Sequence, residues 1–117
     1  MDTTVDHALG DEWWEIKSDQ GITLGLGWLN IDTDWYGNRE GEISLCVNKE
    51  ITGEKIGSTL LFFLEKEIKN REIPITSVVV KKKGNSNYEK VLNWFKEKKY
   101  EIEIDDEKNT YMIKRTN

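Results

Sequence analysis

The sequence predicts an α/β (α+β) domain in which several strands and two main helices share one core. Short apolar runs with the alternation typical of strands occupy the first third and the end of the chain. Two stretches, one from Ile56 and one from Tyr88, repeat apolar residues every three or four positions, as amphipathic helices do. Five Trp, four Tyr and three Phe supply bulky core material, so 33% charged residues does not indicate disorder.

The length of 117 residues predicts one domain with one core. Residues 1–11 are polar and are expected to form a flexible tail, which leaves 12–117 as the single folded domain. The tail holds the only histidine, His7, which has no Cys or His partner at ligand spacing. We therefore predict no metal site.

The single cysteine, Cys46, cannot form an internal disulfide and lies in an apolar run, where we expect it to pack in the core. This usage favours a reducing, cytoplasmic location. No apolar run approaches the ~20 residues that cross a bilayer, and no basic-then-apolar start indicates a signal peptide. We predict no membrane association.

Charge is unevenly distributed along the chain. Residues 1–50 hold three basic and eleven acidic side chains, whereas residues 51–117 hold fourteen basic and eleven acidic ones. This asymmetry suits a phosphate-rich ligand near the second half and a cationic partner near the first, although ordinary solvation explains it equally well. An acidic domain without a dense arginine cluster argues against nucleic acid.

The expected elements follow one another without a repeat or linker. Trp13 to Lys17 and Ile22 to Ile31 predict two strands, with Gly25 and Gly27 marking a bulge or a close backbone contact. Residues 32–42 predict a hairpin loop, because Tyr36 and Ile43 stand where a calcium loop needs oxygen ligands.

The second half alternates strands and helices. Glu42 to Val47 predicts a strand that leads through a glycine loop into a helix ending near Asn70. A strand follows at residues 75–81, then a helix capped by Ser86 or Asn85, and a closing hairpin formed by residues 100–104 and 110–114.

The loop between Val47 and this first helix is the strongest functional feature. Gly53 and Gly57 allow bare backbone to approach a ligand at a helix N-terminus, which favours anions. Any strand-to-helix turn also favours glycine, so this reading stays open beside the functional one. The spacing excludes the P-loop and the G-x-G-x-x-G fingerprint.

This stretch resembles the acetyl-coenzyme A loop of the GNAT N-acetyltransferase superfamily, Arg/Gln-x-x-Gly-x-Gly after a strand ending in Val. The segment Thr52-Gly53-Glu54-Lys55-Ile56-Gly57 keeps the final glycine, with Thr52 in place of Arg or Gln and Lys55 in place of the first glycine. The resemblance implies a short GNAT-like, mixed, mostly antiparallel sheet without the usual first strand and two helices. It covers roughly residues 12–115.

The same resemblance assigns site residues. Acetyl-CoA would be the cosubstrate, and two segments would bind it, namely Leu45, Cys46 and Val47 on the strand and Thr52, Gly53, Glu54, Lys55, Ile56, Gly57 and Ser58 in the loop. The second family signature falls on residues 88–100, where Phe95 replaces the tyrosine that protonates the leaving thiolate. Tyr88 is a substitute acid or a core residue.

Transfer to an amine requires a base, because a free alkylamine has a pKa near ~10.4. Glu42 opens the strand where some family members place this base, although an exposed strand-end charge is the competing interpretation. We expect an N-acetyltransferase acting on a primary amine such as protein lysine, polyamine or amino-sugar. The alternatives are a noncatalytic GNAT-like module that docks a protein through exposed tryptophans and an unrelated α/β domain. The sequence leaves a homodimer open.

Overall fold

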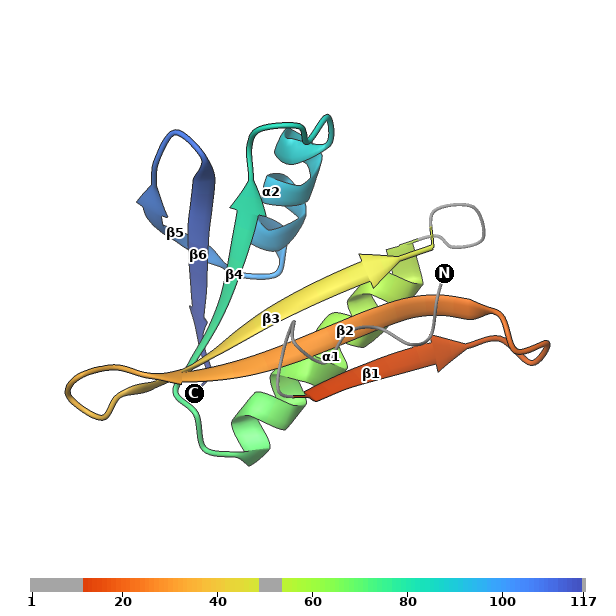
Figure 1. Ribbon diagram of the computed structural model, residues 1–117, viewed down its shortest axis with the longest axis horizontal. Coiled ribbons are helices and arrows are strands. Elements are labelled where there is room, and N and C mark those ends of the chain that lie inside the picture. Colours follow the sequence, from red (N-terminus) through yellow and green to blue (C-terminus); the bar gives the residue numbers. More distant parts are fainter. Residues whose placement is uncertain (1–11, 49–53, 117) are drawn as a thin grey trace.

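The computed structural model describes residues 12–48 and 54–116, which form one six-stranded sheet and two helices (Figure 1). The elements are β1 (Glu12–Lys17), β2 (Thr23–Thr33), β3 (Arg39–Val47), α1 (Glu54–Asn70), β4 (Ile75–Lys81), α2 (Tyr88–Glu97), β5 (Glu101–Asp105) and β6 (Asn109–Arg115). The strand order is β1-β2-β3-β4-β6-β5, and only β3 and β4 are parallel. Neither described helix is long and apolar enough to span a membrane.

The sheet opens between β3 and β4. These strands pair over three positions, Glu40 to Glu42 on β3 with Ile75 to Ser77 on β4, and then diverge into a V (Figure 1). Beyond Glu42, β3 stays paired with β2 as far as Val47. Its other edge therefore has no strand partner within the described residues, which leaves backbone donors and acceptors for another group.

Helix α1 packs on the sheet where glycines remove side chains. A Cβ on Gly25 would lie 2.7 Å from Cδ1 of Leu60, and one on Gly41 would lie 2.8 Å from Cδ1 of Ile68. Gly27 faces Leu64 in the same way, at 3.0 Å. The prediction that Gly25 and Gly27 mark a close contact is confirmed, and the contact is with α1.

The second helix covers β4 and β6 on the same side of the sheet. Leu92 and Phe95 of α2 are buried in the core with Val78, Val80 and Met112. Tyr100, 2% exposed, donates a hydrogen bond to Oε2 of Glu65 on α1 at 2.7 Å, and burial first and then that bond raise its pKa far above the usual range. Lys114 of β6 contacts the same oxygen at 3.1 Å. This network ties α1 to the β6 side of the V.

The predicted fold class is confirmed, and three details are wrong. The hairpin loop predicted at residues 32–42 is shorter, because β2 continues to Thr33 and β3 begins at Arg39, so Glu42 lies inside the strand and does not open it. Cys46 is exposed rather than packed, because the alternation of β3 turns Ile43 and Leu45 toward the helices and Cys46 toward the other face. Helix α2 has Asn87 as its N-cap, without a side-chain capping bond. Asn85 instead accepts a hydrogen bond from the backbone N–H of Asn87 at 3.1 Å.

Replacing Gly25 by alanine should lower the free energy of unfolding by about 1–3 kcal/mol, the usual cost of overpacking. The added methyl group would meet Leu60 at 2.7 Å and Ile56 at 3.0 Å, so these side chains or α1 itself must shift. Urea denaturation measures this change. The matched control is Gly57→Ala, whose Cβ meets nothing closer than 3.6 Å and should leave stability unchanged or raise it. Equal effects of the two variants would contradict the packing account.

Candidate functional site

Glu42 lies at the point where the V opens. It is the last residue of β3 that pairs with β4, opposite Ser77, and its partner on β2 is Asn30. Partners in register share a face of the sheet, so the three side chains form one row across three strands. Gly41 before it and Ile43 after it face the helices, so Glu42 points to the opposite face.

The environment of Glu42 favours a base with a raised affinity for protons. Its side chain is half-buried, and burial raises the pKa of its carboxyl above the ordinary value, with smaller contributions from Asp32 and Glu40. Asp32 and Glu40 are directly opposite each other on β2 and β3. None of these three carboxylates forms an ion pair with a described residue. Such a group takes a proton more readily than a solvated glutamate.

The predicted pantetheine contacts lie on the diverging arm of the V. Leu45, Cys46 and Val47 are the last three residues of β3, all beyond its pairing with β4. Leu45 and Val47 are half-buried and Cys46 is exposed. Their backbone edge facing β4 is unpaired within the described residues, which suits the binding of an extended amide-containing chain.

The predicted loop residues divide into two groups. Thr52 and Gly53 lie outside the described residues, whereas Glu54 to Ser58 form the first turn of α1. A Cβ on Gly57 would lie 3.7 Å from Cγ2 of Val47 and 3.6 Å from Cζ2 of Trp94 on α2. The start of α1 therefore lies against the end of β3, and the positive end of its dipole lies at that arm of the V.

Tyr88 is held by other partners. Its hydroxyl lies 2.6 Å from Oγ1 of Thr110, which donates to Oδ1 of Asp105 at 2.9 Å. Thr110 pairs with Val80, whereas Glu42 pairs with Ser77, three positions earlier along β4. The structure thus places Tyr88 on the other arm of the V from Glu42 and gives its hydroxyl a hydrogen bond. Phe95, where the resemblance expects the acid, is 7% exposed and packs on Tyr100 at 5.3 Å between ring centroids.

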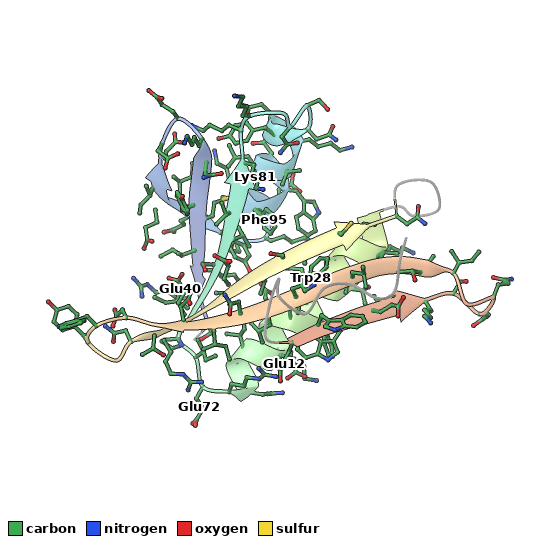
Figure 2. The ribbon with its side chains drawn as sticks, viewed as in Figure 1. Glu12, Trp28, Glu40, Glu72, Lys81 and Phe95 are labelled. Atoms are coloured by element: carbon green, nitrogen blue, oxygen red, sulfur yellow. The ribbon has the colours of Figure 1, made fainter. Side chains whose placement is uncertain are left out.

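Only one lysine of the run at the end of β4 forms an ion pair with a described residue. Lys82 contacts Asp105 at 2.5 Å and donates to the carbonyl of Asp106 at 2.6 Å, which fixes it on the β5–β6 turn. Lys81 is exposed and lies at the wide end of the V (Figure 2). It forms no ion pair with a described residue. Lys83 is also exposed and without an ion pair to a described residue, so Lys81 and Lys83 are the lysines of the run that are available to an anion.

Two residues of this face escaped the sequence reasoning. Oγ of Ser77 and Nε1 of Trp28 are buried without a hydrogen-bond partner among the described residues. Ser77 is 7% exposed and belongs to an apolar strand, Ile75–Lys81, in which a serine looks like ordinary filler. No pattern in the sequence distinguishes Ser77 from its neighbour Thr76, which is also buried. A buried polar atom without a protein partner needs an explanation, and a bound water or a ligand group would supply one.

A cavity of about 530 Å³ lies away from these residues. It is lined by the second half of α1, the start of β4 and the end of β6, including Phe62, Lys66, Lys69 and Arg115. The candidate cofactor residues are at the other end of α1 and on β3. This cavity is therefore separate from the candidate site.

Comparison with known proteins gives structural matches only. No family model and no curated protein sequence matches the chain. Three solved structures that resemble it are the PaiA N-acetyltransferase from Thermoplasma acidophilum in complex with coenzyme A (22% identity, TM-score 0.72, 88% of this chain and 59% of that one), the ribosomal-protein-alanine N-acetyltransferase from Brucella melitensis (17%, 0.71, 88% and 67%) and a GNAT superfamily phosphinothricin acetyltransferase from Sinorhizobium meliloti with acetyl-CoA (12%, 0.70, 88% and 60%).

The matches cover a larger share of this chain than of the solved structures. The chain spans less than two thirds of the Thermoplasma and Sinorhizobium chains, while they cover 88% of it. The match therefore covers most of this chain but only part of the two longer ones. The chain has the fold of the GNAT superfamily N-acetyltransferases.

Proposed function

We propose that this protein is an N-acetyltransferase that transfers the acetyl group of acetyl-CoA to a primary amine. The observation that carries the proposal is the V itself, in which an unpaired strand edge, a helix N-terminus and a half-buried carboxylate converge. Glu42 is at its narrow end, and Leu45 to Val47 and the first turn of α1 line one arm. Structural neighbours with coenzyme A or acetyl-CoA bound support the choice of cosubstrate.

The residues present fit an acyl-coenzyme A molecule. The unpaired edge of Leu45 to Val47 offers backbone partners for the amides of pantetheine, and the N–H groups at the start of α1 offer donors to a pyrophosphate. Gly57 keeps that turn free of a side chain beside Val47 and Trp94. Lys81 at the wide end can add a positive charge. Thr52 and Gly53 stay predicted contacts of the same loop.

When bound, the thioester supplies an activated acetyl group. The chain supplies a place for the amine next to Glu42 and a group that takes its proton. The nitrogen forms a bond to the carbonyl carbon, the carbon–sulfur bond breaks, and the thiolate leaves with the electron pair. Before the attack, Glu42 accepts the ammonium proton directly or through water, and its raised pKa makes it a better acceptor than a solvated glutamate. The second proton, which the nitrogen loses as the amide forms, goes to the departing thiolate or to water.

The binding of the cosubstrate tests the proposal most directly. Saturating acetyl-CoA should raise the melting temperature, because a ligand bound only to the folded state stabilises it. At one hundred times the Kd, the gain is about 2.7 kcal/mol. Adenosine diphosphate, titrated in parallel, is the control. It lacks the pantetheine arm and should therefore stabilise the protein less than acetyl-CoA does. No shift at millimolar acetyl-CoA would end the enzyme hypothesis.

Tyr88 gives a second test, of the proton donor. Tyr88→Phe removes the bond to Thr110 and should lower the free energy of unfolding by about 1 kcal/mol. We expect kcat to change little, because a thiolate whose parent pKa is near ~8.5 leaves without assistance. Unfolding in urea and steady-state transfer are measured on the same preparation. Intact stability with a large loss of kcat would assign the acid to Tyr88.

A noncatalytic docking module is the second candidate, and one observation favours it. Trp35 and Tyr36, at the tip of the β2–β3 hairpin, are 95% and 87% exposed. Asp34 fixes this tip by accepting hydrogen bonds from the backbone N–H groups of Tyr36 and Asn38 at 2.8 and 2.9 Å. An exposed aromatic pair on a fixed turn suits protein binding. If Trp35→Ala leaves kcat and KM for acetyl transfer unchanged, the tip of the hairpin has no part in catalysis.

A further inference from the structure

We propose that the acceptor is a short aliphatic diamine whose second ammonium group is bound by Asp32 and Glu40. This inference deepens the proposed function and rests on it for the identity of the reacting end. The reacting nitrogen lies at Glu42 and Ser77, and the other nitrogen lies one step further along the β2–β3 hairpin. The binding of the second ammonium is a separate property of the chain and can be measured without the thioester.

The first observation is the repulsion between carboxylates on the face of the sheet opposite the helices. Asp32 and Glu40 are directly opposite each other in the β2–β3 ladder, and Asn30 and Glu42 form the next pair on the same face. Like charges directly opposite in a sheet destabilise it. Within the described residues no lysine or arginine pairs with Asp32, Glu40 or Glu42. A local conflict without internal compensation is typical of a functional site whose ligand supplies the missing charge.

The second step is independent of the carboxylates. Ser77, the partner of Glu42 on β4, is 7% exposed, and its Oγ has no hydrogen-bond partner in the described part of the chain. A hydroxyl can accept a hydrogen bond from an ammonium or amine N–H. The register puts Ser77 in one row with Glu42. An amine nitrogen bound between them would donate a hydrogen bond to the serine hydroxyl and would also lie next to the base.

Spacing selects the class of cation. Glu40 and Glu42 are two residues apart on one strand, so their attachment points are separated by about 7 Å. The two nitrogens of an extended tetramethylenediamine molecule are separated by nearly the same distance. A metal ion fits poorly, because the described residues include no group of three acidic, histidine or cysteine side chains close enough to hold one. A molecule with two positive charges on a short alkyl chain matches Glu42 and the Asp32–Glu40 pair better than one compact ion does.

Exposure is graded along the row in a way that suits this occupant. Ser77 is buried, Glu42 and Glu40 are half-buried, and Asp32 is exposed. Figure 2 shows Glu40 beside the narrow end of the V, where β3 and β4 meet. The reacting amine would thus enter the less solvated end, where neutralisation is easier, while the distal ammonium keeps contact with water and two carboxylates.

The test compares tetramethylenediamine with butylamine, which has the same chain length and one nitrogen. We expect the diamine to have at least about tenfold higher kcat/KM, mostly through KM, since the second charge contributes to binding and not to the chemical step. Asp32→Asn and Glu40→Gln should each remove most of that preference, which is taken as the ratio of kcat/KM for the diamine to kcat/KM for butylamine in the same variant. Ser77→Ala should weaken both amines equally. Equal kcat/KM for the two amines would overturn the proposal.

A binding measurement separates this inference from the proposed function. Calorimetric titration of the protein with tetramethylenediamine, without a thioester, should give heat of binding that Asp32→Asn weakens about tenfold or more. Glu103→Gln on β5, also exposed, is the matched control and should bind like the wild type. If the diamine binds in this way but no transfer occurs, the diamine site stands and the transferase proposal fails. If no diamine binds, or if Glu103→Gln weakens binding as much, the site is wrong even where transfer to other amines is found.

Discussion

Replacing Glu42 by glutamine should lower kcat for acetyl transfer by about 10²–10⁴-fold, the range that a positioned general base contributes. Glutamine keeps the size of the side chain but cannot accept the ammonium proton. Acetyl-CoA affinity should be unchanged, because Glu42 is on the face of β3 opposite the helices. Transfer to an amine is measured by release of free thiol. Unchanged kcat would show that the base lies elsewhere.

Stability separates loss of chemistry from loss of folding in this variant. A carboxyl whose pKa is raised on folding binds its proton more tightly in the folded state, so its ionisation destabilises the fold as the pH rises through that pKa. Glu42→Gln removes this ionisation and should raise the free energy of unfolding at neutral pH. A variant that is more stable and less active would be hard to explain by misfolding. Loss of both together would instead indicate a structural role.

The pH dependence follows from the same environment. Burial, Asp32 and Glu40 raise the pKa of Glu42, so the acid limb of kcat/KM should lie above the ordinary pKa of glutamate, about 4.3. Asp32→Asn removes one of the negative neighbours and should move that limb to lower pH, measured with butylamine as acceptor. A limb that does not move would exclude Glu42 as the titrating group.

Gly57→Glu should weaken acetyl-CoA binding by about 100-fold, since like charges near 4 Å at a protein surface repel by about 4 kcal/mol before salt reduces the effect. The new carboxylate would stand in the first turn of α1, beside Val47 and Trp94, where we place the pyrophosphate. Calorimetry with acetyl-CoA measures the change. It should diminish as sodium chloride is raised, because the cause is electrostatic.

Gly57→Gln is the control for size. It has the same shape as the glutamate variant without its charge, so the difference in affinity between the two isolates repulsion. A Cβ at position 57 is 3.6 Å from Trp94, an ordinary contact, so both variants should fold. If the glutamine and glutamate variants bind alike, the pyrophosphate does not lie at this turn. If both bind like the wild type, the loop is not part of the cofactor site.

The sequence alone determined the elements and their order. Periodicity placed both amphipathic helices and the strands within a few residues, because alternation and three-to-four spacing depend only on which face is buried. It also indicated that Gly25 and Gly27 mark either a bulge or a close backbone contact, since these are the usual reasons for glycine inside a strand. The resemblance to the GNAT loop pointed to Glu42, to residues 45–47 and to residues 52–58 as parts of one site.

Only the tertiary structure decided how these parts meet. That β3 and β4 pair for three positions and then separate is a property of two strands that are distant in the sequence, and no local pattern encodes it. The register across three strands aligned Ser77 and Asn30 with Glu42, and Asp32 with Glu40, although they are far apart in the chain. The same alternation exposed Cys46, which its apolar neighbours had suggested was buried. Pairing between distant strands is a non-local property, so the row of side chains at the narrow end of the V was invisible until the sheet was assembled.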